Sequence, residues 1–294
     1  MASETCKGGA CGSDDDERFV VVRKRGRKGW RRPCGTDGKV ATAICDLGNQ
    51  VSVEKIDTVM KNACSNTELI NYSRQVISLL LKSLSGRQLS SIWALGLGSF
   101  SRCCYPGCDQ LAMLLELQHY FGCEVCFQEP CLTETEKRWL CNHDIYVSET
   151  KDLLKCRISD DDDNNENVVL FYAPHCGHAI YNSVIYAHRK KLKRIIIAGN
   201  NFHSVNLMTK HLSKYEKSIQ NPEEYNVMEI SDCNELQALS LYSEVCSLLK
   251  FPTFKPNFAV FNDTALHFLS QNAPLPEISE IRPKYRLFRH EIVI

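Results

Sequence analysis

The chain has 294 residues, and its 35 Lys and Arg residues balance its 35 Asp and Glu residues, so its formal net charge is zero. Hydrophobic residues make up 44% and charged residues 24%, which is typical of a soluble globular protein. The balanced charge argues against nucleic acid or a membrane surface as a partner, and no apolar run reaches the roughly 18 residues of a membrane span.

Residues 1–36 are predicted to be a disordered, charged N-terminal tail. They are rich in Gly and Ser, and seven of the ten residues 23–32 are Lys or Arg, shortly after an acidic run. A solvated charged arm is the simplest interpretation, and nuclear targeting or an RNA contact helped by Trp30 are the alternatives. Because the N-terminus lacks a hydrophobic signal core, we expect a cytoplasmic protein with reduced cysteines, and the basic run leaves a nuclear location open.

Residues 37–294 are predicted to form a single domain, with core motifs at about 91–270. Helical spacing of apolar residues predicts a helix from Thr67 to Leu84, and Gly86 is a fitting stop. Three further helices are predicted. One spans 109–121, one begins at the Thr133–Glu136 capping box, and one spans 178–190. Strands are predicted at 91–98, 124–130, 167–176 and 194–200, with 143–148 and 225–231 as weaker candidates, and the acidic stretch 159–168 is expected to be an exposed loop.

The predicted strands are continuous apolar runs, which are typical of strands covered on both faces. Helices separate these strands in the sequence, and that alternation indicates βαβ units. We therefore predict an α/β, Rossmann-like fold whose mostly parallel sheet is covered by helices on both faces.

Four unusual clusters follow predicted strands: "GLGSFS" (96–101), "QEP" (128–130), "PHCGH" (174–178) and "GNNF" (199–202). In a doubly wound sheet, ligands bind in the crevice beyond the carboxyl ends of the strands. Each cluster alone could be a tight turn, but four at one edge favour a small-molecule site. The candidate ligand-binding residues are Gly96, Gly98, Ser99, Glu129, His175 and Asn200.

Gly96 and Gly98 would permit a sharp turn and the close approach of a phosphate or a sugar. A nucleotide fingerprint would place a third glycine near Phe100, where there is none. Glu129 is the right type of residue to bind a ribose, although it follows Gly96 by 33 residues rather than about 20. S-adenosylmethionine, a nucleotide and haem all stay open as ligands.

The cluster His175, Cys176 and His178 could be a metal site, a nucleophile with its base, or a loop that contacts a ligand. Zinc is usually held by well-separated pairs of ligands. The second pair could come only from another loop, the one that carries Cys103, Cys104 and Cys108. A sequence neighbour is rarely a positioned base for Cys176. We therefore predict no metal and assign no catalytic residue. We expect His175 to face the crevice and His178 to begin a helix. The alternative is a loop of packed side chains that binds no ligand.

The ordered set of motifs resembles the SRR-like (Sensitivity to Red Light Reduced) family of plants, fungi and animals. The matching pieces are "WALGLGSFS" (93–101), "QLAMLLEL" (110–117), "EVCFQEPCLTETEKRWL" (124–140), "VVLFYAPHCGHAIYNSVI" (168–185), "RIIIAGNNF" (194–202) and "FNDTALHFL" (261–269). "FVVVRKRGRKG" near the N-terminus is similar to the start of animal members. Two departures are Glu129-Pro130, where the family usually has Asp-Pro, and Asn201, where a serine is common.

The resemblance implies a regulatory protein of haem biosynthesis and of circadian clock gene expression, acting through a protein partner or a small-molecule ligand. The family brings no established catalytic mechanism, so the sequence favours a regulator over an enzyme. The alternative is a Rossmann-like enzyme that binds S-adenosylmethionine or a nucleotide, although adenosylmethionine enzymes usually carry an acid where Ala94 stands. The chain has no Cys-Pro dipeptide, so direct haem sensing through that motif has no support.

Overall fold

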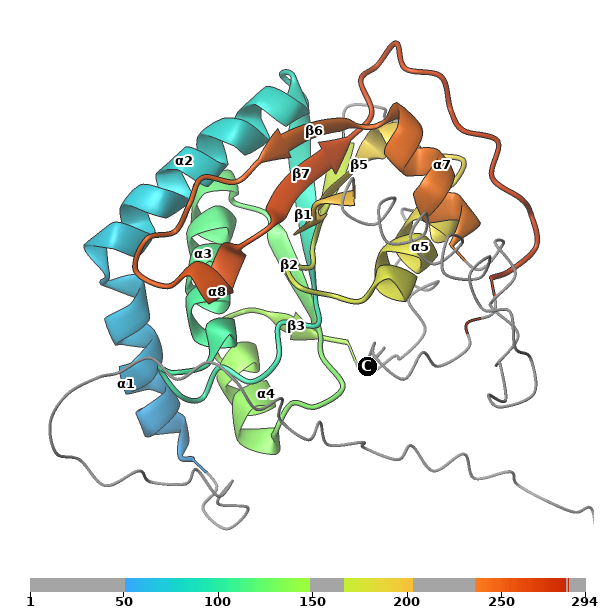
Figure 1. Cartoon of the computed structure of the whole chain (residues 1–294). Helices are drawn as coiled ribbons and strands as arrows, with labels where there is room; N and C mark the ends of the chain where they lie inside the picture. The colour runs from blue at the N-terminus through green and yellow to red at the C-terminus, as the bar shows by residue number, and fades with distance from the viewer. Residues whose placement is uncertain (1–50, 149–166, 203–235, 284, 286–294) are drawn as a thin grey trace, which may run out of the picture. The chain divides into compact units, whose positions relative to one another are not determined.

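The computed structural model describes residues 51–148, 167–202, 236–283 and 285, and these carry a seven-stranded sheet (Figure 1). They belong to one unit, Leu47–Ile294. The strands are β1 (Gln88–Leu95), β2 (Glu124–Gln128), β3 (Tyr146–Val147), β4 (Asn167–Tyr172), β5 (Ile195–Asn200), β6 (Ser247–Lys250) and β7 (Thr264–Phe268).

The strand order is β3-β2-β1-β4-β5-β7-β6. Strands β1 to β5 pair in parallel, whereas β7 is antiparallel to both of its neighbours, β5 and β6. The chain moves from β1 to β2 on one side and places β4 on the other side of β1. The carboxyl ends of β1 and β4 therefore form the topological switch point, where ligands bind in sheets of this kind.

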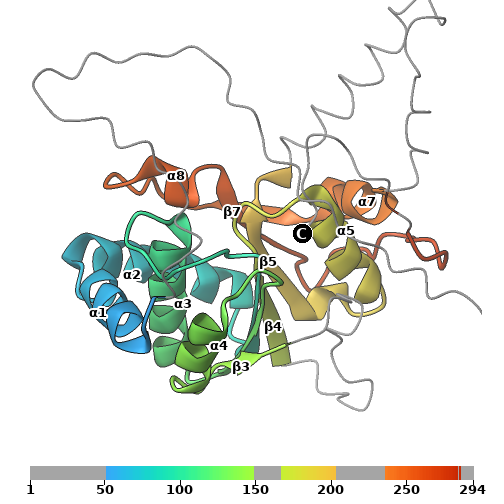
Figure 2. The same ribbon diagram turned by 90° about the horizontal axis from the view of Figure 1, so that it is seen from below.

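Helices cover both faces of the sheet (Figure 2). One face carries α1 (Val53–Cys64), α2 (Thr67–Leu84), α3 (Pro106–Phe121), α4 (Glu134–Cys141) and the short α8 (Phe258–Phe261). The other face carries α5 (His178–Ala187) and α7 (Gln237–Val245), and a 3-10 turn, η2 (Leu192–Arg194), leads into β5. None of the helices in the described part of the chain is long and apolar enough to cross a bilayer.

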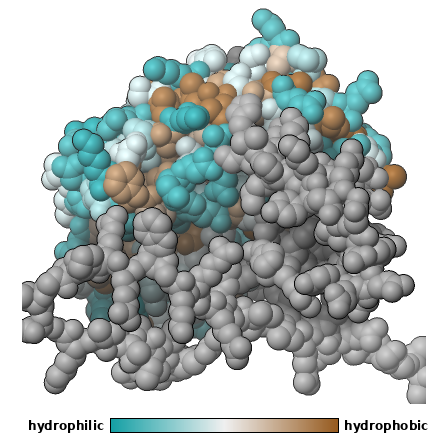
Figure 3. Space-filling model, in the orientation of Figure 1, coloured by the Kyte–Doolittle hydropathy of each residue, from teal (hydrophilic) through white to brown (hydrophobic). Residues whose placement is uncertain are grey.

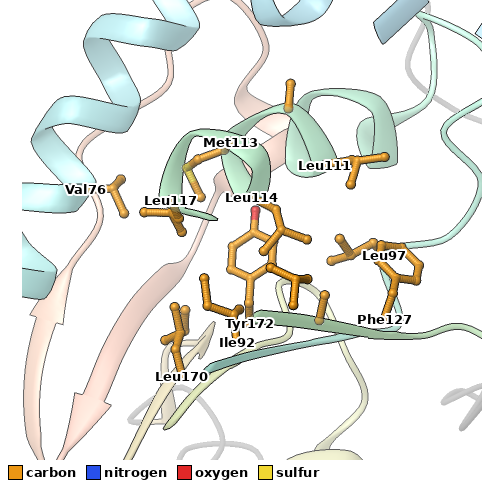
Figure 4. Packing of buried hydrophobic residues seen from close by; sticks show 14 of the residues in the cluster. Val76, Ile92, Leu97, Leu111, Met113, Leu114, Leu117, Phe127, Leu170 and Tyr172 are labelled. Carbon is orange, nitrogen blue, oxygen red and sulfur yellow. The ribbon is translucent and has the colours of Figure 1, made fainter. Parts of the chain in front are cut away.

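Alternating residues of each central strand enter the two hydrophobic cores. In β4, Leu170 and Tyr172 point to the α3 face, whereas Val169 and Phe171 point to the α5 face. Figure 4 shows Tyr172 rising from the sheet toward α3, among Leu114 and Leu117. The predicted α/β fold with a doubly covered, mostly parallel sheet is confirmed, and double coverage explains the continuous apolar runs.

Helix α2 has the predicted limits. The side chain of Asn66 caps its first turn by accepting a hydrogen bond from the Glu68 backbone N–H, and Ser85 closes its end in the left-handed conformation. Several other elements are shorter than predicted. Strand β1 ends at Leu95, before the predicted limit of 98, because Gly96 and Gly98 have φ angles of +63° and +74° and turn the chain out of the sheet.

Some predicted segments differ in extent or fall outside the described residues. The helix predicted at 109–121 begins three residues earlier, because Pro106 occupies the first helical position, which suits proline. Elements β6, β7, α7, α8 and α1 were not predicted from the sequence. The predicted tail (1–36), the strand at 225–231 and most of the acidic loop at 159–168 lie outside the described residues.

Candidate functional site

The turn after β1 is fastened to the end of β2 by the side chain of Glu129. The Gly98 backbone N–H donates to Glu129 Oε2 at 2.8 Å, and the Cys131 N–H donates to Oε1 at 2.9 Å. The Gly96 N–H donates to the Gln128 carbonyl at 3.0 Å and so extends the pairing of the two strands. Glu129 is only 6% exposed. The sequence candidates Gly96, Gly98 and Glu129 therefore meet in one place.

A second carboxylate, Glu136 of α4, holds the rest of the same turn. Its Oε1 accepts hydrogen bonds from the Ser99 hydroxyl at 2.5 Å and from the backbone N–H groups of Phe100 at 3.1 Å and Ser101 at 3.3 Å. Its Oε2 accepts from the backbone and hydroxyl of Thr133, both at 2.9 Å, which completes the predicted capping box. Glu136 is fully buried. Ser99 is thus turned toward Glu136.

A third glycine, Gly107 in the first turn of α3, lets the helix approach this loop. A Cβ atom there would lie 2.6 Å from the Ser99 carbonyl oxygen and 2.7 Å from the Leu97 carbonyl oxygen. The third glycine of a dinucleotide fingerprint has the same task, close packing of helix and strand. Here it follows Gly96 by eleven residues, so the fingerprint spacing could not reveal it.

On the other side of the switch point, Asn200 at the end of β5 holds the loop after β4. Its side-chain oxygen accepts from the His175 backbone N–H at 2.9 Å, and its side-chain nitrogen donates to the Cys176 carbonyl at 3.1 Å. His175 is exposed and has a φ of +59°, a conformation that histidine tolerates better than most residues. The candidates His175 and Asn200 are therefore in direct contact.

The imidazole of His175 is tied to helix α8. Its Nε2 lies 3.0 Å from the Val260 carbonyl oxygen, and because a carbonyl only accepts, this nitrogen carries the proton. The buried side chain of Gln110, from α3, donates to the same oxygen at 2.9 Å. One carbonyl of α8 thus joins the loop after β4 to α3.

Cys176 lies where the two sides meet. Its thiol donates to the Leu95 carbonyl at 3.2 Å, and a Cβ atom on Gly96 would lie 2.7 Å from its sulfur. Burial, and then the nearby Glu129 carboxylate, raise the pKa of this thiol to about 12. A neutral, buried thiol is a packing group, because the thiolate is the nucleophile.

The site carries negative charge on its β1–β2 side. None of the ion pairs among the described residues involves Glu129 or Glu136, whose partners are backbone N–H and hydroxyl groups. We call the turn after β1, residues 96–101, the glycine turn. Its N–H groups at Gly98, Phe100 and Ser101 already donate to these carboxylates. The turn therefore suits a ligand with hydroxyl groups or positive charge better than one with phosphates.

We call Gly96, Gly98, Ser99, Glu129, His175, Cys176 and Asn200 together the carboxyl-edge site. Helix α5 begins at His178, as predicted. Sequence reasoning named the capping box but did not connect Glu136 with the glycine turn, and it gave no sign of Gly107 or Val260. Within the described residues no group of three His, Cys, Asp or Glu side chains is arranged to hold a metal ion.

The SRR1 domain family matches residues 67–268, which is more than half of the chain. The chain belongs to this family. No curated protein matches its sequence.

Solved structures with a similar fold differ widely in sequence. The PH0226 protein from Pyrococcus horikoshii OT3 is 14% identical over 69% of this chain and 91% of its own, with a TM-score of 0.32. The plantazolicin methyltransferase BpumL in complex with SAH is 14% identical over 73% of this chain and 87% of its own, with a TM-score of 0.29. At these values neither structure informs the function of this chain.

Proposed function

We propose that this SRR1-family protein is a regulator that binds a small molecule at the carboxyl-edge site and acts on haem biosynthesis and on circadian clock gene expression. The observation that carries the ligand proposal is the contact of Gly98 with Glu129, at the topological switch point. This contact joins the turn at Gly96 and Gly98, which a ligand can approach closely, to the Glu129 carboxylate, which can accept hydrogen bonds from ribose hydroxyls. The haem and clock roles rest on family membership.

Among the three candidate ligands, S-adenosylmethionine fits the site best. It offers ribose hydroxyls, a sulfonium and an ammonium group to a region that carries two buried carboxylates. A nucleotide would bring phosphates to N–H groups that already donate to Glu129 and Glu136. For haem, the Nε2 nitrogen of His175 carries a proton and already donates to Val260, so only its Nδ1 could be an iron ligand.

An adenosylmethionine-dependent enzyme is the second candidate, favoured by the strand order. The order β3-β2-β1-β4-β5-β7-β6 puts the topological switch point at the carboxyl ends of β1 and β4, where Rossmann-like enzymes bind their ligands. Fold alone does not assign an activity, because one fold carries many functions. We therefore assign no catalytic residue.

A thermal-shift and calorimetric titration tests the ligand proposal. S-adenosylmethionine, S-adenosylhomocysteine, ATP, NAD and haem are each added to the full chain. A ligand at a hundred times its Kd should stabilise the fold by about 2.7 kcal/mol. We expect this with S-adenosylmethionine, a large loss of affinity in Glu129→Gln, and normal affinity in Glu124→Gln, which changes an exposed glutamate at the start of the same strand.

Three outcomes would count against this proposal. Stabilisation by ATP or NAD alone would overturn the ligand class. Equal binding by Glu129→Gln and Glu124→Gln would remove the site from the carboxyl edge, and no binding of any of the five would overturn the ligand-binding role. The protein can also be incubated with S-adenosylmethionine and cell extract, and S-adenosylhomocysteine measured by mass spectrometry. Its formation would favour the enzyme over the regulator.

The regulatory role is tested in cells that lack the protein. His175→Asn, which keeps a residue tolerant of the left-handed conformation, should leave protein abundance normal. We expect it to fail to restore haem content and clock period if His175 faces the ligand. Full restoration at normal abundance would remove His175 from the functional site, and failure of the unchanged chain to restore either phenotype would overturn the regulatory role.

A further inference from the structure

Beyond the carboxyl ends of β5 and β6 lies a pocket of about 240 Å³, built mainly by the connection from β6 to β7. We call it the Phe pocket. Figure 3 shows hydrophobic residues gathered on this face of the molecule, over β6, β7 and α8. The pocket is lined by Asn201, Lys250, Phe251, Pro252, Thr253, Phe254, Phe258, Phe261, Asn262, Asp263 and Thr264.

The walls of the Phe pocket are fixed before any ligand arrives. The Phe251 N–H donates to the Thr264 carbonyl at 2.9 Å, which extends the pairing of β6 with β7. Two prolines, Pro252 and Pro256, restrict the backbone of the connection, and Asn257 caps α8 by accepting from the Ala259 N–H. A preformed pocket needs little ordering on binding.

Aromatic rings form the back of the pocket. Phe254 and Phe261 both pack on Tyr72 of α2, with ring centroids 5.0 Å and 4.9 Å apart from that of Tyr72. At the mouth, Phe258 is 64% exposed, which is unusual for a ring of this size. An aromatic ligand could pack on these rings in the offset or edge-to-face geometry that aromatic pairs prefer.

The size and charge of the pocket define its ligand. A volume of about 240 Å³ is below the range of pockets for drug-sized molecules, about 300–1,000 Å³, and suits one or two fused rings. The lining holds two exposed charged groups, the ammonium of Lys250 and the carboxylate of Asp263, and within the described part of the chain no carboxylate forms an ion pair with Lys250. We propose that the Phe pocket binds a small planar aromatic carboxylate, with its ring on the phenylalanines and its carboxylate toward Lys250.

This site is separate from the carboxyl-edge site but adjoins it. Asn201, which lines the pocket, directly follows Asn200, and α8 carries both Phe258 and the Val260 carbonyl that accepts from His175. The proposal does not depend on what binds at the carboxyl edge, because none of its lining residues belongs to that site.

Three indole probes of similar shape test the proposal by calorimetry and NMR titration of the full chain. They are indole-3-acetate (an anion), indole (neutral) and tryptamine (a cation). We expect indole-3-acetate to bind about fivefold more tightly than indole, as one exposed charge pair contributes up to about 1 kcal/mol. Tryptamine should bind most weakly, and tighter binding of tryptamine than of indole-3-acetate would show that Asp263 sets the charge preference and would overturn the proposal.

Variants at exposed positions separate the ring contact from the charge. Phe258→Ala should weaken the binding of indole-3-acetate about tenfold or more. Lys250→Gln should reduce the affinity for indole-3-acetate to the affinity for indole. Tyr146→Ala is the matched control, because Tyr146 is 69% exposed on β3, at the opposite edge of the sheet. Equal affinities for the three probes would overturn the role of Lys250. No binding, or equal binding by Phe258→Ala and Tyr146→Ala, would overturn the site.

Discussion

The carboxyl edge of the sheet divides into two sides that are held by different polar groups. On the β1–β2 side, the carboxylates of Glu129 and Glu136 gather the N–H groups of the glycine turn. On the β4–β5 side, the amide of Asn200 holds the next loop. The first side is charged and buried, whereas the second is neutral and leaves His175 exposed.

This difference indicates which side should lose stability on substitution and which should tolerate it. Removing a buried carboxylate leaves several backbone donors unsatisfied, at about 1–3 kcal/mol for each buried group. Substituting an exposed side chain usually changes stability by no more than about 0.5 kcal/mol. The β1–β2 side should therefore be intolerant of substitution, and the β4–β5 side should be tolerant at His175.

The largest effect is expected at Cys176, where the two sides meet. At pH 8, a thiol with a pKa of about 12 holds roughly a thousandth of the thiolate of one at the ordinary value of 9.0, so its alkylation should be slower by that factor. Peptide mass spectrometry after iodoacetamide treatment measures this, with the exposed Cys141 as the reference. Similar rates for the two thiols would show that the sides separate in solution.

The next largest effect is expected for Glu136→Ala. It would leave the N–H groups of Phe100, Ser101 and Thr133 without their acceptor, so the free energy of unfolding should fall by about 3 kcal/mol or more. Urea denaturation measures the loss. Glu134→Ala, at an exposed position on the same helix, should change stability by less than about 0.5 kcal/mol. Equal effects of both would contradict a special role for the buried carboxylate.

A smaller effect tests the contact between the two sides directly. In Gly96→Ala, the new methyl group would meet the Cys176 sulfur at 2.7 Å, which should cost about 1–3 kcal/mol beyond the strain of a positive φ. Gly86→Ala measures the strain alone, since its φ is +84° and its added methyl group would meet nothing within 4 Å. In a Cys176→Ala background the extra cost at Gly96 should vanish. If it persists, the sulfur is not what excludes a side chain there.

The smallest effect is expected for His175→Asn. The substitution removes the hydrogen bond to the Val260 carbonyl but keeps a residue that tolerates a φ of +59°, so the loss should be about 1 kcal/mol or less. Chemical denaturation compares it with Asn200→Ala, which removes two hydrogen bonds of the loop and should cost more. A larger loss for His175→Asn would reverse the assignment of rigid and tolerant positions.

The sequence by itself determined those features that depend on local pattern. Helical spacing and its caps predicted α2, and the Thr133–Glu136 spacing predicted the capping box of α4. Continuous apolar runs predicted the doubly covered sheet, because each residue of such a strand meets one core or the other. The same runs, followed by glycine and polar clusters, placed the candidate residues at one edge.

Only the tertiary structure decided the contacts between distant segments. The insertion of β7 between β5 and β6 leaves no local signal, since strand order depends on how the whole sheet packs. The bonds of Glu136 to a turn 35 to 37 residues away, the contact of Cys176 with Gly96, and the Phe pocket between Asn201 and residues 250–264 arise in the same way. The periodicity of apolar residues predicts which face of a helix or strand is buried, but the topology determines which element packs against that face.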